Sequence, residues 1–493
     1  MGQGKMRFWA SAAAAVAMVV VAPGPAFGAT GGDLAAVDRF VAEFADEAGY
    51  RGVAVAITKG DQVVHVAGYG HDSAGAAITA ATPMPVASVS KSFTALAVLQ
   101  LVEAGKVALD RPVRDYVPDF HLADPRGAGI TVRQLLNQTS GITDGTLREK
   151  SLPQPDSLAG AVTRAHQATL AAEPGTEHHY TNTNYHLAAR LVEVVAHEPF
   201  ANYLRTHVFG PAGMRATTTI DRTPRDLPAT VAKGYVYAYG LSIPAAEPDR
   251  FVAGSDGVIT TAADMARWLV VQGNGGRTAD GTRLVSPQAI TAMHTAADPR
   301  WTYAMGWDTS PNGQVRHSGI WFTYTAGELL LPSGYGIAVL TNSGYSLGND
   351  GTALLEDGIA TLLAGGTPST GAPTRLVIDL VLGALTLVGA ALGVRAIVRG
   401  RRWAERLGTR PAWRLALRLA PRLLPLAVLV PLPYLLGSVV GGGRDVTYGE
   451  IVYYSVALFV WVLVTTVVNL GVIAARVIAL VRVRRASTQV STG

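Results

Sequence analysis

Cysteine is absent from this chain of 493 residues. Its absence excludes a disulfide framework, a thiolate metal site and a lipid-modified cysteine. Lysine is also scarce, because it occurs only at positions 5, 59, 91, 106, 150 and 233. Among these six positions, only Lys91 has a serine three residues before it. The scarcity of lysine therefore directs attention to Ser88 and Lys91.

Acidic residues are few beyond residue 365, where fifteen arginines accompany four carboxylates. Lys5 and Arg7 add positive charge at the other end, so residues 30–365 are acidic although the whole chain carries +5. A basic isoelectric point, here about 9.3, is typical of proteins that bind nucleic acid. The arginines in this chain flank long apolar runs, however, and that distribution indicates membrane topology and no nucleic-acid partner.

The first 29 residues have the pattern of a secretory signal peptide. Lys5 and Arg7 form a positive start, residues 10–22 are apolar, and small residues near 26–28 offer a cleavage site. An uncleaved anchor is the alternative, although the apolar run is short for a membrane span. Both interpretations predict that the next segment, residues 30–365, is exported.

Three apolar runs follow a linker rich in Gly, Pro, Ser and Thr at residues 366–375. Each run is close to the ~20 residues that a helix needs to cross the hydrocarbon core of a membrane. The second run is short and holds three prolines. We therefore predict a C-terminal transmembrane region, residues 376–493, with three spans at about 376–398, 423–440 and 451–475.

The distribution of arginine predicts how these spans are oriented. Eight arginines lie in the loop 399–422 and four in the tail after residue 475, whereas the loop 441–450 holds one. Under the positive-inside rule, the arginine-rich loop and the tail are cytoplasmic. Residues 30–375 and 441–450 are then extracytoplasmic, in agreement with the export signal. We predict a multi-pass protein of the cell membrane, in contact with the lipid bilayer, whose main domain faces outward.

Two groups of strand patterns enclose a middle that is mainly helical. Runs rich in valine at 52–58 and 62–68 are joined by a short glycine-containing turn and predict a hairpin. Further strands are predicted at 314–318, 322–331 and 335–342, and helices at 131–138, 184–197, 261–272 and 352–364. This order predicts an α/β (α+β) fold for residues 30–365, in which helices flank an antiparallel sheet and a largely helical insert packs beside it.

Ser88 and Lys91 lie at the start of an apolar segment that is typical of a buried helix. Residues three positions apart share one helical face, so the hydroxyl and the amine point the same way. A serine becomes an effective nucleophile when a neighbour takes its proton, and a helix start offers free N–H groups to a developing oxyanion. An N-cap serine followed by a surface lysine has the same pattern, so other motifs must distinguish the two.

Tyr180 and Asn182 form the only Tyr-x-Asn motif in the chain, directly after a Pro-Gly-Thr turn and before a helical segment. A phenol beside a lysine ammonium is a plausible proton shuttle, because the positive charge favours loss of its proton. The amide of Asn182 suits a substrate carbonyl. Taken alone, the motif fits an ordinary loop tyrosine with a turn asparagine.

His317, Ser318 and Gly319 form the only His-[Ser/Thr]-Gly motif, at the end of a predicted strand. Glycine at such a position lets a ligand approach the backbone closely. The next N–H group, that of Ile320, is placed to donate to an oxyanion. Taken alone, His317 fits a structural histidine on a strand.

In their order along the chain, the three motifs resemble the serine β-lactamase-related family, which includes class C β-lactamases, D-alanyl-D-alanine carboxypeptidases and related esterases. The resemblance covers about residues 33–364, and stretches at 135–142, 208–214 and 253–257 support it. It implies that Ser88 is the acylated nucleophile, that Lys91 is its electrostatic and proton partner, and that Tyr180 is the general base.

The resemblance also implies roles in substrate binding. Asn182 would contact the substrate amide, and residues 317–319 would line the sheet edge along which the substrate lies. The N–H groups of Ser88 and Ile320 would form the oxyanion hole. No cofactor and no metal are expected.

Two positions depart from the family pattern. His317 stands where class C β-lactamases usually have lysine. A histidine at this position resembles the carboxypeptidases and some esterases. We expect Lys91 to keep His317 largely neutral. A neutral histidine would attract a substrate carboxylate weakly. Gln138 stands where many relatives have histidine, and we expect its role to be structural.

The sequence therefore predicts a membrane-anchored, extracytoplasmic serine hydrolase that acts through an acyl-enzyme on Ser88. D-Alanyl-D-alanine carboxypeptidase activity on peptidoglycan peptide is favoured, and β-lactamase or a small-ester or peptide hydrolase of the same family are the alternatives. A penicillin-sensing receptor is an alternative of another class, although the loop 399–422 is short for a signalling domain. A metal hydrolase using His178, His179 and His186 lacks a zinc pattern that includes a carboxylate.

Overall fold

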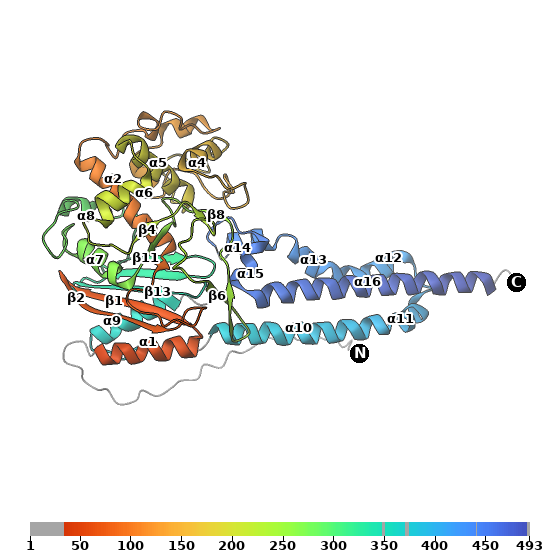
Figure 1. Ribbon diagram of the computed structural model, residues 1–493. Helices are drawn as coiled ribbons and strands as arrows, with labels where there is room; N and C mark the ends of the chain where they lie inside the picture. Colours follow the sequence, from red (N-terminus) through yellow and green to blue (C-terminus); the bar gives the residue numbers. More distant parts are fainter. Residues whose placement is uncertain (1–33, 348–350, 370–373, 440, 491–493) are drawn as a thin grey trace, which may run out of the picture.

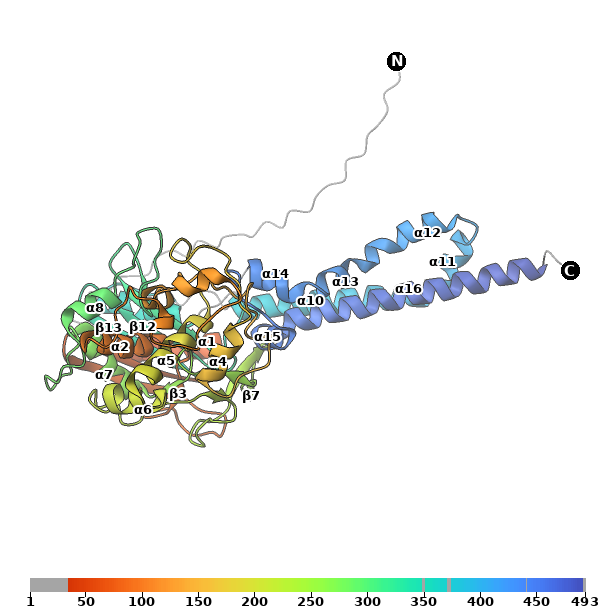
Figure 2. The same ribbon diagram turned by 90° about the horizontal axis from the view of Figure 1, so that it is seen from above.

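The computed structural model describes residues 34–347, 351–369, 374–439 and 441–490. A rounded body and a long bundle of helices make up this part of the chain, and the bundle projects from one side of the body (Figures 1 and 2). The predicted signal peptide, residues 1–29, lies outside the described residues, as does part of the predicted linker.

A six-stranded sheet forms the centre of the body, and all its neighbouring strands are antiparallel. The first and last strand groups of the body share this sheet, because β1 pairs with β13 so that Val55 lies opposite Val339. The strands, in spatial order, are β10 (Asp308–Thr309), β11 (Val315–Ile320), β12 (Thr325–Leu330), β13 (Tyr335–Thr341), β1 (Gly52–Lys59) and β2 (Gln62–Gly70). The predicted strands and their antiparallel pairing are confirmed.

Both faces of β1 are buried, which explains why the strand is apolar at almost every position. Val53, Val55 and Ile57 point into the core beneath α1 (Leu34–Ala48) and α9 (Gly351–Leu363). Ala54 and Ala56 point to the opposite core, which the insert supplies. The period of two along the strand thus divides its side chains between two helical layers.

The insert between β2 and β10 is largely helical, as predicted, and it also contains short strands. Its helices are α2 (Ser90–Glu103), α3 (Val132–Leu136), α4 (Leu158–Ala165), α5 (Asn182–Ala196), α6 (Phe200–Tyr203), α7 (Ala262–Gly273) and α8 (Pro287–Met293). Its short strands are β3 (Met84–Pro85), β4 (Thr218–Thr219), β5 (Arg222–Thr223), β6 (Gly234–Ala238), β7 (Leu241–Ala245), β8 (Arg250–Phe251) and β9 (Val258–Thr260). The stacked rings of Phe93 on α2 and Trp268 on α7, 4.0 Å apart, join two of these helices in the core.

Two C-terminal helices, α10 (Thr374–Val398) and α16 (Val456–Val490), are long and apolar enough to cross a membrane. They run side by side in both views (Figures 1 and 2). The segments 412–429 and 432–439 meet at a bend of 61° and qualify as a third span only if they are taken together. The prediction of three spans therefore stays open for the second span, in which Pro431 and Pro433 lie at the bend.

Shorter helices complete the C-terminal region: α11 (Gly400–Leu407), α12 (Ala412–Leu419), α13 (Leu424–Leu429), α14 (Leu432–Val439) and α15 (Tyr448–Tyr454). The sequence predicted a span over about 451–475, and in the structure the apolar helix long enough to cross a membrane begins at Val456. The backbone of Ser455 is extended, so α15 ends at Tyr454 and α16 begins at Val456. Leu432, Val446, Ile451 and Val462 form a small core that holds α14, α15 and α16 together beside the body.

Candidate active site

Ser88 lies on a short 3-10 turn, Ala87–Val89, that leads into α2. The sequence placed it in the first turn of the helix, so the structure moves it just outside. Ala87 has a φ of 48°, a left-handed conformation that is costly for a residue with a side chain. A Cβ atom on Gly319 of β11 would lie 2.0 Å from the carbonyl oxygen of Val86. The glycine of the third motif therefore lets β11 pack directly on the turn that carries the serine.

Lys91 is the second residue of α2 and is fully buried, and its ammonium group is held by the residues around the serine. Its Nζ atom donates to Ser88 Oγ at 2.9 Å, to Asn182 Oδ1 at 2.9 Å and to the Ser255 carbonyl at 3.0 Å. An ammonium has three N–H groups, so these partners use all of them. The structure thus brings Ser88, Lys91 and Asn182 together, as the sequence predicted.

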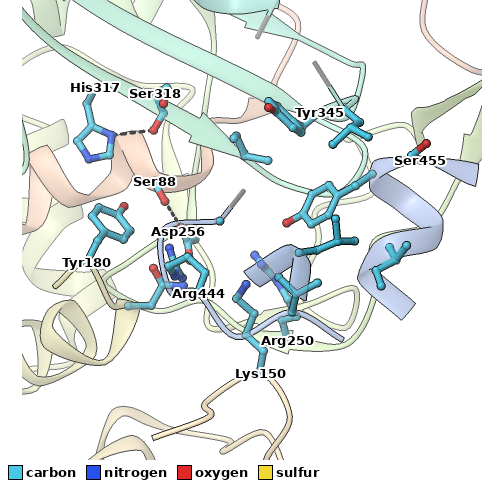
Figure 3. Close-up of a pocket in the computed structure, with 18 of the residues that line it drawn as sticks. Ser88, Lys150, Tyr180, Arg250, Asp256, His317, Ser318, Tyr345, Arg444 and Ser455 are labelled. Carbon is cyan, nitrogen blue, oxygen red and sulfur yellow. Dashed lines mark hydrogen bonds between the residues drawn. The ribbon is translucent and has the colours of Figure 1, made fainter. Parts of the chain in front are cut away.

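Asp256 is the carboxylate beside this cluster, and the sequence did not single it out. Ser88 Oγ donates to Asp256 Oδ1 at 2.6 Å (Figure 3), and Lys91 Nζ lies 3.4 Å from the same oxygen. Burial raises the pKa of Asp256, but the charges of Lys91 and Arg250 together with hydrogen bonds from Ser88 and Ser255 outweigh burial and lower it. A buried ammonium needs an opposite charge, and that need was the available signal for a carboxylate.

Tyr180 lies between two positive charges. Lys91 Nζ is 4.9 Å from the centroid of its ring, and the guanidinium carbon of Arg444 is 5.0 Å from it. Gln138 holds the loop that carries the tyrosine, because its side-chain oxygen accepts from the Thr181 N–H at 3.2 Å and its carbonyl accepts from the His179 N–H at 2.9 Å. The structure agrees with a structural role for Gln138.

His317 is buried in β11 and neutral. Its Nδ1 atom lies 2.7 Å from the Ser318 carbonyl, so Nδ1 carries the proton and Nε2 accepts from the Tyr303 hydroxyl at 3.2 Å. Burial, and next the charge of Lys91, lower the pKa of His317 from 6.5 to about 3. The sequence attributed the neutral form to Lys91, whereas burial is the larger cause. Ser318, the neighbouring residue on the strand, is exposed and Ile320 is half-buried, and both line the cavity described next.

A cavity of about 440 Å³ opens beside Ser88 (Figure 3). One part of its wall comes from the body and carries polar side chains. Another part comes from the C-terminal region. The body contributes Ser88, Lys150, Tyr180, Asn182, Arg250, Asp256, Asp308, His317, Ser318, Ile320, Tyr345 and Leu347, and the C-terminal region contributes Leu436, Gly441, Arg444, Val446, Ile451, Tyr454, Ser455 and Leu458.

Arg444 is the charged residue that the C-terminal region brings to this cavity. Its Nε atom donates to Asp144 Oδ2 at 2.8 Å, and the backbone N–H of Asp445 donates to the same oxygen at 2.9 Å. Burial lowers the pKa of Arg444, but nearby negative charge, chiefly that of Asp144, raises it above its ordinary value. The sequence used Arg444 only to count charges in a loop, so its position beside Tyr180 was missed.

Arg250 also lines the cavity, and two of its nitrogens lack a hydrogen-bond partner. Nε and Nη2 are buried without one among the residues that the structure describes, while the guanidinium carbon lies 4.9 Å from the ring centroid of Phe322. A buried guanidinium with free N–H groups is suited to bind a carboxylate or another planar anion. The sequence gave no signal for this residue.

Two of the three histidines of the metal-hydrolase alternative have other partners, whereas the Nε2 atom of His178 is buried without a hydrogen-bond partner among the residues that the structure describes. His186 Nδ1 lies 2.8 Å from the Ala253 carbonyl, and His179 Nε2 lies 2.9 Å from a carboxylate oxygen of Glu177. Across residues 34–490, apart from the short undescribed gaps, we find no group of three or more His, Asp or Glu side chains arranged to hold a metal ion.

Comparison with known proteins gives a consistent result. Residues 37–360 match the family described as Beta-lactamase. Penicillin-binding protein 4 of Amycolatopsis lactamdurans is 30% identical over 315 residues, which cover 60% of this chain and 81% of that protein. Protein flp of Staphylococcus aureus (strain MW2) is 29% identical over 302 residues, 59% of each chain. The octameric penicillin-binding protein homologue from Pyrococcus abyssi has a TM-score of 0.59 at 26% identity and covers 71% of this chain and 81% of that one.

The fold is that of proteins with a Beta-lactamase domain, and the chain belongs to the Beta-lactamase family. The resemblance that the three motifs indicated is therefore confirmed at the level of the family. This chain spans 59% of the length of flp. The family match ends at residue 360, so α10 and all later elements lie beyond it.

Proposed function

We propose that the protein is a serine hydrolase that forms an acyl-enzyme on Ser88. One observation carries the proposal: the buried ammonium of Lys91 donates to Ser88 Oγ and to Asn182 beside the ring of Tyr180. The Lys91 ammonium is thus positioned to stabilise the developing alkoxide on Ser88, while Asp256 balances the charge of that ammonium.

Tyr180 takes the proton of Ser88 in this proposal. Lys91 Nζ is held by Ser88, Asn182 and the Ser255 carbonyl, and its role in this proposal is to stabilise the developing charge on Ser88. The lowered pKa of Asp256 makes its carboxylate a weak base. Tyr180 is left as the acceptor, with positive charge near its ring from Lys91 and Arg444 to stabilise the phenolate.

The reaction then proceeds in two steps. Ser88 Oγ forms a bond to the substrate carbonyl carbon, the bond to the leaving amine or alkoxide breaks, and Tyr180 returns the proton to the leaving group. In the second step Tyr180 takes a proton from water, the water oxygen bonds to the carbonyl carbon, the bond to Ser88 Oγ breaks, and Tyr180 returns the proton to Ser88 Oγ. The N–H groups of Ser88 and Ile320 are the proposed oxyanion donors, and Asn182 with the strand 317–319 positions the substrate.

A carboxypeptidase acting on peptides that end in D-alanyl-D-alanine is the first candidate activity. Such a substrate ends in a carboxylate. Neutral His317 offers no charge to it, whereas Arg250 offers a guanidinium with unpartnered N–H groups in the cavity wall. β-Lactamase and esterase or amidase activities use the same acyl-enzyme and are the alternatives. A penicillin-sensing receptor would be acylated in the same way but would remain acylated.

Intact mass spectrometry and labelling test the proposal. We expect a fluorescent penicillin or fluorophosphonate to label the wild-type protein at one residue, and Ser88→Ala to abolish labelling while the protein stays folded. Labelling that survives Ser88→Ala would overturn the mechanism. The mass measured over time after addition of penicillin or of a D-alanyl-D-alanine peptide separates an enzyme, which returns to its original mass, from a sensor.

We further propose that the protein is anchored in the cell membrane by its C-terminal region, with residues 30–375 and 441–450 outside and 399–422 and the C-terminus inside. The contacts of Arg444 and Asp445 with Asp144 support this topology, because segments in contact lie on the same side of a membrane. A reporter fused after Gly493 should be active only in the cytoplasm. Activity of that reporter only in the exported compartment would contradict the topology.

A further inference from the structure

The cavity beside Ser88 has an apolar wall that the catalytic body does not supply. Leu436 on α14, Ile451 on α15 and Leu458 on α16 line it together with Val446. The same three helices pack against one another through their own small core, so the wall is a fixed surface. Figure 3 shows the ribbon of this region facing the strand that carries Ser318.

A wholly polar substrate would gain little binding affinity from contact with this apolar wall. An alkyl chain placed against it would leave water, and each buried methylene raises affinity on the order of fourfold. The cavity of about 440 Å³ also lies in the usual size range of small-molecule sites, so a scissile group and a chain fit within it together. Helix α16, which supplies Leu458, is apolar enough to cross a membrane, so the wall adjoins the proposed membrane span.

We propose that the substrate is an amphiphile, an ester or amide whose apolar chain lies against Leu436, Ile451 and Leu458 while its carbonyl group faces Ser88. The inference rests on the proposed hydrolase function and narrows its substrate class. Ser88 and Tyr180 line the cavity from the body, whereas the three apolar side chains line it from the C-terminal region, so the carbonyl and the chain occupy different surroundings.

The test uses the full-length protein in lipid nanodiscs and two pairs of model substrates. p-Nitrophenyl acetate and octanoate differ in the acyl chain, and S-ethyl and S-octyl thioacetate differ in the leaving group. Thiol release from the second pair is measured with a thiol reagent, because a chain without cysteine gives no background. We expect at least one pair to show a preference of tenfold or more in kcat/KM for the longer chain.

Tryptophan substitutions locate the origin of that preference. Leu436→Trp and Leu458→Trp fill the apolar end, and we expect each to reduce the long-to-short ratio of kcat/KM at least fivefold. Matched controls on the same helices are Leu435→Trp and Val467→Trp, whose native side chains are 39% and 60% exposed. Because the controls experience the same partitioning of substrate into lipid, their ratio should equal that of the wild-type protein.

The outcomes separate the inference from the proposed function. Hydrolysis of the short substrates and labelling of Ser88 without any chain-length preference would overturn the inference alone. An equal fall of the ratio in the cavity variants and the controls would also overturn it, because the effect would then not arise at the wall. Absence of labelling at Ser88 and of hydrolysis of every substrate would overturn the proposed function itself.

Discussion

Replacing His317 by glutamine should make the protein less sensitive to acid. His317 has an ordinary pKa of 6.5 in the unfolded chain and a pKa of about 3 in the folded one, because the side chain is buried and lies near Lys91. Between these values the unfolded chain binds a proton that the folded chain does not. The free energy of unfolding therefore falls as the pH falls from about 6.5 towards 3.

The magnitude follows from the two pKa values. Between pH 7 and pH 5, protonation of the unfolded histidine removes about 2 kcal/mol of the free energy of unfolding, and the complete loss below pH 3 is about 5 kcal/mol. His186 and His294 are also buried, with pKa values lowered to about 3 and about 4, so they add to the loss in the wild-type protein and in the variant alike. The difference between the two proteins in this loss of free energy of unfolding therefore measures the contribution of His317.

Urea unfolding of the full-length protein in nanodiscs, followed by tryptophan fluorescence at pH 7, 6 and 5, measures this difference. Glutamine can form hydrogen bonds but does not titrate. Between pH 7 and pH 5, we therefore expect the free energy of unfolding of His317→Gln to fall by about 2 kcal/mol less than that of the wild-type protein. His71→Gln is the control, because its side chain is exposed. Equal pH dependence of His317→Gln and the wild-type protein would refute the reasoning, whatever the stability of the variant at pH 7.

Two further substitutions test the charges around Ser88. Asp256→Asn leaves the buried ammonium of Lys91 without its carboxylate, so we expect the free energy of unfolding to fall by about 3 kcal/mol and labelling by fluorescent penicillin to slow. Unchanged stability in urea unfolding would show that the neutral acceptors of Lys91 are enough to hold the buried charge. Arg250→Gln removes the unpartnered guanidinium, so we expect kcat/KM for a D-alanyl-D-alanine peptide to fall about tenfold more than for its C-terminal amide. Equal losses for peptide and amide would mean that Arg250 does not bind the carboxylate.

The strands were predictable because their burial repeats with the period of the backbone. Alternate side chains of β1 enter two different cores, so the strand is apolar at almost every position. An apolar run between turn residues predicts a buried strand of this kind. Ser88, Lys91, Tyr180 and Asn182 were predictable for another reason, since rare motifs in a fixed order carry information that their single residues lack. Within the third predicted span, about 451–475, the extended backbone of Ser455 separates α15 from α16, and a count of apolar residues does not locate such a break.

The residues that sequence reasoning missed reach the site through contacts between distant segments. Asp256 follows Ser88 by 168 positions and Arg444 follows Asp144 by 300 positions. No periodicity connects such pairs, and a single arginine in a short loop indicates only a preference for one side of the membrane. Arg444 was thus used as evidence for topology, while its contact with Asp144 and its position beside Tyr180 depended on tertiary structure.

The contact between Arg444 and Asp144 has a practical consequence for how this protein is studied. Removing the C-terminal helices at the linker is the obvious way to obtain the body of the protein alone. That truncation would keep Ser88, Lys91 and Tyr180, but Asp144 would lose its partner and the cavity would lose one wall to solvent. Rates and inhibitor affinities measured on the excised domain would describe a more open and less cationic pocket. A drug screen run on it would favour compounds that the intact protein has no room to admit.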